Sequence, residues 1–361
     1  MTSIFQQVAL FQPWQNSLVS PHGVASVLGL LLPGADGNTH QQILTALSYE
    51  NSSPDKKLGD LHRNLTKSSP GATVTIANGV FAQKGFEMKG PFLSAIERDY
   101  QCESRDLDFS DTASAVAAIN GWISDRTDGN ITSLVRPDML DGPLTRLVVV
   151  NSIYFKGLWK SPFRPKDTKM GIFTGGDRTK HIVPMMSQLS LLKTGTASTP
   201  AGLLYTVIEL PYQEDTLSML IALPPEGTLL SAFLPHVGVA TVQSWAGLLR
   251  LRSVQLSLPR FSVEAELDMK GPLLAMGVTD MFIKNKADFR HISSEPLYVS
   301  KVLQRAKMEV SEDGTKASVA TASVLLSRSS PLLVTVNSPF LFLIQHNPTG
   351  TILFIGLINK P

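Results

Sequence analysis

The sequence predicts an α+β fold in a single domain that spans residues 1–361. Segments with helical periodicity are concentrated in the first third of the chain, and segments with strand periodicity dominate from residue 173 onward. No Gly/Ser-rich linker and no internal repeat divides the chain, which is long enough to bury a large core.

Helices are predicted where apolar residues recur at three- and four-residue spacing. Pro21 favours a helix start in the first third, and Asn38 or Thr39 provides a cap for the next helix. We expect the first segment to be the last turns of a helix that is truncated at the N-terminus. The expected helices are residues 3–11, 24–32, 38–47, 91–100, 112–127, 231–249 and 269–276.

Strands are predicted where apolar residues alternate or run together over short stretches. Residues 144–159 form a nearly continuous apolar run, which is typical of a central strand covered on both faces. Residues 205–210 and 217–223 flank a turn and predict a hairpin. The expected strands are residues 73–81, 144–159, 205–210, 217–223, 253–258, 261–267, 303–310, 333–336, 340–345 and 351–355.

Composition excludes several classes of protein. Hydrophobic residues make up 43% of the chain and charged residues 17%, as in an ordinary globular protein. The net charge of +2 is too small to indicate a nucleic-acid partner, and no apolar run reaches the roughly 18 residues of a membrane span. Cys102 is the single cysteine, so no internal disulfide is expected. It is interpreted as a buried apolar side chain, with a catalytic thiol as the alternative.

The compartment is indicated by opposing signals. Lack of disulfides is typical of cytosolic proteins, whereas three Asn-x-Ser/Thr sequons, at Asn51, Asn64 and Asn130, are typical of secreted ones. No signal peptide is visible in this chain, which fits a mature or truncated form.

No motif in the sequence indicates catalysis. The chain has no nucleophile elbow, no phosphate-binding loop, no dinucleotide fingerprint and no histidine pair at metal-ligand spacing. We therefore expect neither an enzyme nor a bound cofactor. Asn151 is either a buried polar pin in a central strand or a polar residue at its edge, and Trp159 is either a core indole or a ligand anchor.

The stretch 312–331 lies between two predicted strands but resembles neither a strand nor a solvated linker. Alternate residues form a face of small side chains that could enter a gap between strands. Near its end Arg328 precedes Ser329, so the stretch suggests a protease bait that can later become a strand. The alternative is a flexible surface loop, although loops of this length usually carry function. The face comprises Thr315, Ala317, Val319, Thr321, Ser323 and Leu325.

Several short motifs occur in the order found in one protein family. They are Ser20-Pro21, Asn151, Phe155-Lys-Gly-Leu-Trp159, Glu209-Leu-Pro-Tyr212, Leu258-Pro-Arg-Phe261, Gly277-Val-Thr-Asp-Met-Phe282, Val310-Ser-Glu-Asp-Gly-Thr315 and Asn347-Pro-Thr-Gly350. Over nearly its whole length the chain resembles the serpin family. Within that family, residues 307–318, 328–331 and 358–361 resemble the nexin and plasminogen-activator-inhibitor branch.

The resemblance implies a fold and a mechanism. The fold has three β-sheets, eight or nine helices and an exposed reactive-centre loop over about 312–331. The implied activity is inhibition of trypsin-like serine proteases, such as thrombin, urokinase, tissue plasminogen activator, plasmin and trypsin. Attack at the Arg328–Ser329 bond would form an acyl-enzyme, which is trapped when the cut loop inserts into the central sheet. A carrier or binding serpin without inhibitory activity is the alternative.

The resemblance also implies particular site residues. The hinge would be Glu312, Gly314, Thr315, Ala317 and Val319, of which Val319 is larger than the Ala or Gly usual at its position. Opening of the central sheet would be controlled by Ser20, Asn151 and Gln304. Gly23 stands where many serpins have a second serine.

Nexins bind heparin through a lysine-rich helix that aligns with residues 56–71. The candidate heparin ligands here are Lys56, Lys57, Arg63 and Lys67. Gly59 and Asp60 occupy positions where lysines are expected, and the Asn64 sequon lies on the same segment. The alternative is a solvated helix face. We expect an extracellular monomer whose partners are proteases and, if this site is used, heparin or heparan sulfate as an activator.

Overall fold

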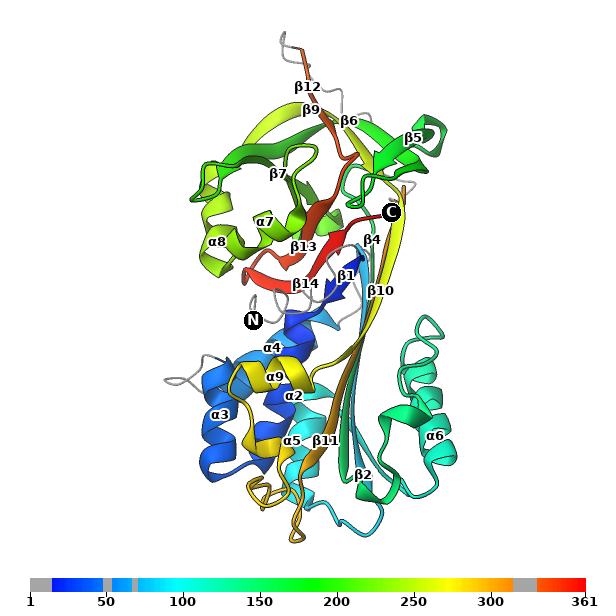
Figure 1. Cartoon of the computed structure of the whole chain (residues 1–361), viewed down its shortest axis with the longest axis vertical. Coiled ribbons are helices and arrows are strands. Elements are labelled where there is room, and N and C mark those ends of the chain that lie inside the picture. The colour runs from blue at the N-terminus through cyan, green and yellow to red at the C-terminus, as the bar shows by residue number, and fades with distance from the viewer. Residues whose placement is uncertain (1–14, 48–53, 67–70, 314–329) are drawn as a thin grey trace.

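The computed structural model describes residues 15–47, 54–66, 71–313 and 330–361, with the backbone alone for residues 54–58. In these ranges eight α-helices and two β-sheets are present. Figure 1 shows a long sheet along the molecule, helices on both sides of its lower half, and a second sheet over its upper half. The predicted helix at residues 3–11 lies outside the described ranges. The helices are α2 (Pro21–Leu31), α3 (Gly37–Leu47), α4 (Pro54–Leu65), α5 (Gly90–Tyr100), α6 (Thr112–Arg126), α7 (Leu230–Phe233), α8 (Val239–Leu248) and α9 (Lys270–Ala275).

The long sheet has five strands, in the order β10, β11, β4, β2, β3. Its central strand β4 is the predicted apolar run, and its residues alternate between two cores. Val149 faces the core beneath α2, whereas Val148 and Val150 face the core beneath α6, so both faces are covered as predicted. The strands are β10 (Phe261–Asp268), β11 (Val299–Val310), β4 (Leu147–Gly157), β2 (Ala72–Gln83) and β3 (Glu103–Leu107).

The second sheet has nine strands. The resemblance implied three sheets, and one strand explains the difference. The 19-residue β6 pairs with β5 at its start, with β9 along its middle and with β7 at its end, so it joins two expected sheets into one hydrogen-bonded sheet. The strands are β1 (Ser17–Val19), β14 (Thr351–Ile358), β13 (Phe340–His346), β8 (Leu217–Leu223), β7 (Leu204–Pro211), β6 (Lys180–Ser198), β9 (Arg250–Pro259), β12 (Leu332–Thr335) and β5 (Lys169–Thr174).

The prediction of one helix over residues 231–249 is wrong. Two shorter helices, α7 and α8, are present there, separated by a 3-10 turn that contains Pro235. Proline lacks the N–H group that a continuous helix would need at this point. The strands β1, β3, β5 and β6 were not predicted as separate elements.

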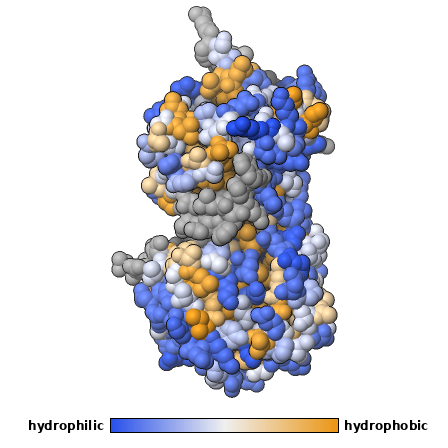
Figure 2. Space-filling view, in the orientation of Figure 1, coloured by the Kyte–Doolittle hydropathy of each residue, from blue (hydrophilic) through white to orange (hydrophobic). Residues whose placement is uncertain are grey.

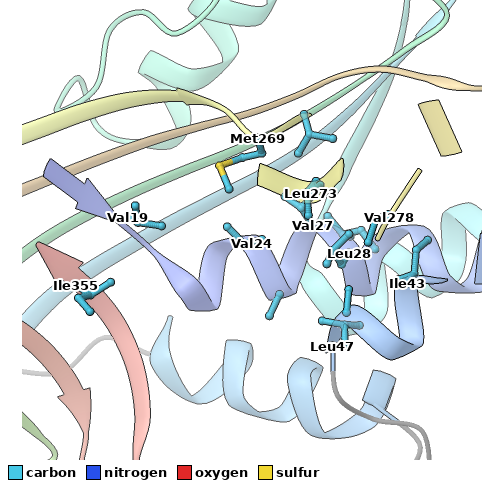
Figure 3. Packing of buried hydrophobic residues seen from close by; sticks show 14 of the residues in the cluster. Val19, Val24, Val27, Leu28, Ile43, Leu47, Met269, Leu273, Val278 and Ile355 are labelled. Carbon is cyan, nitrogen blue, oxygen red and sulfur yellow. The ribbon is translucent and has the colours of Figure 1, made fainter. Parts of the chain in front are cut away.

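Helix α2 is buried along its entire length, and its position agrees with the helix predicted over residues 24–32. Ser20 is its N-cap, because the Ser20 hydroxyl accepts a hydrogen bond from the Gly23 N–H at 3.0 Å. Pro21 occupies the first turn, where backbone N–H groups have no partner within the helix, so its missing N–H removes no hydrogen bond. Figure 3 shows the apolar side chains of α2, among them Val24 and Leu28, packed with residues of α3, α9 and β14. The helix therefore holds a fixed position above the five-stranded sheet.

Candidate functional site

Three polar residues lie side by side in the middle of the five-stranded sheet. The strand register aligns Asn78 of β2, Asn151 of β4 and Gln304 of β11 in one row. All three side chains are buried. Because buried amides must be hydrogen-bonded to be tolerated, the row predicts a network that spans the three strands.

The hydrogen bonds of this row are complete from strand to strand. The Asn151 Nδ2 donates to Asn78 Oδ1 at 2.9 Å, and the Gln304 Nε2 donates to Asn151 Oδ1 at 3.0 Å. The Asn78 Nδ2 in turn donates to the backbone oxygen of Tyr100 at 3.4 Å. The prediction that Asn151 is a buried polar pin is therefore confirmed, and Asn78 is a partner that the sequence analysis missed.

Gln304 also ties β11 to the start of α2. Its Oε1 accepts a hydrogen bond from the Ser20 N–H at 2.9 Å, and its Nε2 donates to the Ser20 backbone oxygen at 3.1 Å. The Ser20 hydroxyl donates to the backbone oxygen of Leu353 in β14 at 2.7 Å. Ser20, Asn151 and Gln304, which the resemblance assigned to one role, thus lie in contact, and together with Asn78 we call them the sheet-pairing cluster.

Because Gly23 has no side chain, the amide groups of the sheet-pairing cluster can pack against its backbone. A Cβ atom at this position would lie 2.1 Å from Asn151 Oδ1 and 2.7 Å from Gln304 Nε2. Both distances are far below van der Waals contact. The presence of glycine where many serpins have serine is therefore explained by the packing of two amide side chains under the first turn of α2.

Strands β4 and β11 are parallel neighbours, and the predicted loop leaves from the end of β11. The loop stem at 311–313 is held by several contacts. The Trp159 Nε1 donates to the backbone oxygen of Ser311 at 2.8 Å, and the Trp159 N–H donates to that of Asp313 at 3.1 Å. Trp159 is buried and its ring stacks on Tyr212 with centroids 4.4 Å apart. It is a core indole, as predicted, and it also fixes the loop stem.

Charged groups hold the same stem from two sides. Glu312, a predicted hinge residue, accepts a hydrogen bond from the Thr168 hydroxyl at 2.8 Å and lies 3.7 Å from the Arg260 guanidinium. Lys156 lies 3.1 Å from the Asp313 carboxylate and lowers the pKa of that group. These partners come from distant parts of the chain, and no local signal identifies them.

Two buried histidines lie between α2 and α4, beside the sheet-pairing cluster. The His22 and His62 rings are stacked with centroids 6.2 Å apart, and His62 also contacts the Tyr100 ring at 6.4 Å. None of the four ring nitrogens has a hydrogen-bond partner in the described part of the chain. Burial, followed by the neighbouring charge of His62, lowers the pKa of His22 to about 3. Burial, followed by the charge of Arg63, lowers the pKa of His62 to about 4.

The candidate heparin residues lie on or next to α4. The backbone of Lys56 and Lys57 belongs to this helix, their side chains are not described, and Lys67 lies outside the described residues. The Arg63 guanidinium contacts the Asp60 carboxylate at 2.5 Å and lies 3.7 Å from that of Asp99. These carboxylates neutralise much of the positive charge that Arg63 presents to a polyanion.

The remaining candidates divide between described and undescribed residues. Asn64 is exposed, and Asn130 is partly exposed with its Nδ2 donating to the Thr127 backbone oxygen at 2.9 Å. Cys102 is buried, and burial raises the pKa of its thiol, which confirms the interpretation as an apolar core residue. The predicted sites that lie outside the described residues are Asn51, Gly314, Thr315, Ala317, Val319, Arg328 and Ser329.

Among the described helices, none has both the length and the apolar character to cross a membrane.

Comparison with known proteins places the chain in a family. The family model described as serpin, serine protease inhibitor, matches residues 1–361. Glia-derived nexin of Mus musculus is 48% identical over 360 residues, a match that covers 99% of this chain and 91% of the relative. Plasminogen activator inhibitor 1 of Neovison vison is 38% identical over 364 residues, a match that covers 99% of this chain and 90% of the relative.

Solved structures agree with this assignment. The crystal structure of native protease nexin-1 with heparin covers 100% of this chain and 96% of that chain, with 44% identity and a TM-score of 0.93. The match to the crystal structure of uncleaved ovalbumin covers 100% of this chain and 97% of that chain, with 26% identity and a TM-score of 0.90. The expected fold class is confirmed. The chain therefore belongs to the serpin family of serine protease inhibitors and is not an enzyme.

Proposed function

We propose that this chain is a suicide-substrate inhibitor of trypsin-like serine proteases, such as thrombin, urokinase, tissue plasminogen activator, plasmin and trypsin. The protease serine attacks the Arg328 carbonyl, the peptide bond to Ser329 breaks, and the new amine of Ser329 leaves with a proton. An ester then links the protease to Arg328. The loop that carries this ester inserts between β4 and β11 before water can hydrolyse it, and the displaced protease stays attached.

The observation that supports this proposal is the parallel pairing of β4 and β11. The two strands pair from Val299 and Leu147 to Glu309 and Lys156, with one register shift between Val299 and Lys301, and the loop begins where β11 ends. A chain that turns back from β11 and enters between the two strands runs antiparallel to both. Insertion therefore replaces one parallel ladder with two antiparallel ladders, which are slightly more stable per residue.

The sheet-pairing cluster supplies a barrier to premature insertion. Separation of β4 from β11 breaks the bond between Gln304 and Asn151 and exposes buried amides that have lost partners. An unpaired buried polar group costs about 1–3 kcal/mol, so these residues keep the sheet closed until the loop is cut. The Trp159 and Arg260 contacts hold the stem of the uncut loop.

We further propose an extracellular site of action, consistent with the exposed sequon residue Asn64 and with the predicted target proteases. Heparin is a candidate activator because protease nexin-1 was crystallised with it. The site on α4 would be weaker than a continuous lysine face, since Asp60 and Asp99 already pair with Arg63.

Incubation with trypsin tests the proposed mechanism. We expect a covalent complex that survives SDS electrophoresis, and we expect Arg328→Ala to abolish it for arginine-specific proteases. Arg164→Ala, which changes an exposed arginine outside the loop, is the matched control and should form the complex normally. Thr315→Arg should turn the inhibitor into a substrate, because a charged side chain then has to enter the sheet.

Loop cleavage distinguishes the alternative, a serpin that acts as a binding or carrier protein. An inhibitor should gain thermal stability when its loop is cut by a protease that it does not trap, because the loop becomes a strand. Cleaved chain with an unchanged melting temperature, and no complex with any protease of the panel, would favour the carrier.

A further inference from the structure

An exposed apolar patch lies on the outer face of the sheet at the base of the predicted loop. Residues of β6 alternate so that Leu189 and Leu191 are exposed while Ser190 and Leu192 are buried. In β12, Val334 is buried and Leu333 is 74% exposed. Figure 2 shows hydrophobic surface gathered at this pole, over β12 and β9.

Strand register places these leucines on one face of the sheet, with Gln255 of β9 between Leu333 and Leu189. Leu333 pairs with Gln255 of β9, and Gln255 pairs with Leu189 of β6, so the three share one row and one face. Leu191 lies one row further along β6, opposite Ser253, and Leu251 lies in the row beyond. We call Leu189, Leu191, Leu251 and Leu333 the leucine patch. At about 4.8 Å between strands and about 6.8 Å between rows, it is roughly 10 by 14 Å across.

The size of the leucine patch limits what it can bind alone. Stable protein–protein interfaces bury about 800 Å² on each partner, several times the area of four neighbouring leucines. A second copy of this chain would therefore find too little surface here for a stable dimer. A partner already held by another contact needs far less, because the second contact forms at a high effective concentration.

The target protease is such a partner. Leu333 follows Arg328 by five residues, so the two lie at most about 18 Å apart along an extended chain. A protease domain of roughly 200 residues has a radius of gyration of about 16 Å and is roughly 40 Å across. A protease whose active site holds Arg328 therefore extends over the base of the loop, where it meets the end of β12.

We infer that the leucine patch is a second docking surface for the target protease, which contacts it through an apolar rim beside the active site. This inference rests on the proposed inhibitory function and adds a determinant of specificity to it. Arg328 admits every trypsin-like protease, whereas a fixed apolar surface beside the loop favours those with a complementary rim. The four leucines carry no charge, and Lys193, which lies opposite Leu251 at the border of the patch, is paired with the Glu209 carboxylate at 3.1 Å, so the selection depends on apolar contact.

The experiment measures second-order rate constants of inhibition for trypsin, thrombin and urokinase. The variant L189S/L333S removes two leucines and leaves the loop intact. For the protease that the wild type inhibits fastest, we expect the rate constant to fall about tenfold, since burial of two leucines favours the encounter by about 1.4 kcal/mol or more. The stoichiometry of inhibition and the melting temperature should not change. Leu144→Ser is the matched control, because Leu144 is 66% exposed and precedes the start of β4, at the end of the sheet away from the loop.

Three outcomes would overturn the inference. The rate constant could be the same in L189S/L333S and the wild type, or Leu144→Ser could lower it equally. Sedimentation could instead show that the wild type self-associates through the patch while inhibition is unaffected. If the wild type forms no covalent complex at all, the proposed function fails before the variants are compared.

Discussion

The buried pair His22 and His62 predicts that acid destabilises this protein well above the pKa values of the folded state. Both rings are neutral when folded, with a pKa of about 3 for His22 and about 4 for His62. In the unfolded chain each has a pKa near 6.5. Between these values the unfolded state binds more protons, so stability falls as the pH decreases from 6.5. Above pH 6.5 both histidines are neutral in the folded and the unfolded states, so they no longer reduce the stability of the protein.

The magnitude follows from the distance between the working pH and 6.5. At pH 5.0 each histidine lowers the free energy of unfolding by about 2 kcal/mol, because it is protonated in the unfolded chain but neutral in the folded state. The pair lowers it by about 4 kcal/mol. A chain of 361 residues has an unfolding entropy of roughly 0.76 kcal/mol/K, so 1 kcal/mol shifts the melting temperature by about 1.3 °C. The pair should lower the melting temperature by about 5 °C between pH 7.5 and pH 5.0.

The variant His62→Leu isolates this effect. It replaces an imidazole without hydrogen-bond partners by an apolar side chain of similar volume, and it removes one titrating group. We expect the fall in melting temperature between pH 7.5 and pH 5.0 to be smaller by about 2–3 °C than in the wild type. Differential scanning fluorimetry at one scan rate measures this difference.

His291→Leu provides the control for His62→Leu. Its side chain is 56% exposed and lies 3.5 Å from the Asp36 carboxylate, so this variant removes a histidine that is not buried and tests whether the effect of His62→Leu depends on burial. If His62→Leu shows the same fall in melting temperature as the wild type, the reasoning from burial is refuted.

Three further predictions concern other contacts. Gly23→Ala should destabilise the protein by about 1–3 kcal/mol and shorten the half-life of inhibitory activity at 37 °C, because its Cβ would lie 2.1 Å from Asn151 Oδ1; an unchanged melting temperature would contradict this. Trp159→Phe removes the indole N–H that holds the loop stem and should speed spontaneous loss of activity several-fold, with the residual activity over time as the measurement. Asp60→Asn removes one of the two carboxylates that pair with Arg63 and should raise the salt concentration that elutes the protein from immobilised heparin; earlier elution would argue against a site on α4.

Much of the fold could be predicted from local pattern. The apolar run of β4 and the buried helix α2 are both where the sequence placed them, because burial on two faces requires apolar residues at every position. The split of residues 231–249 into two helices was missed although Pro235 is a visible signal. The long strand β6 was missed because it changes neighbours along its length, and its pattern changes with them.

The residues of the candidate site could be predicted in part from the sequence, but the contacts between them could not. Ser20, Asn151 and Gln304 were identified by resemblance, but their mutual contacts span up to 284 residues of sequence. Asn78 was accessible as a polar residue in an apolar strand, as Asn151 was, yet only the register makes them neighbours. The leucine patch also depends on register, because its members belong to three strands and look like ordinary apolar positions in each.

The sequence by itself determined the α+β class, the positions of most elements, the family resemblance and the predicted bait bond at Arg328. Each of these is encoded in local composition, periodicity or motif order. The tertiary structure alone decided the strand register, the sheet-pairing cluster, the space at Gly23 and the stacking of His22 on His62. These are contacts between residues far apart in the chain, and they exist only because packing brings distant elements to within a few ångströms.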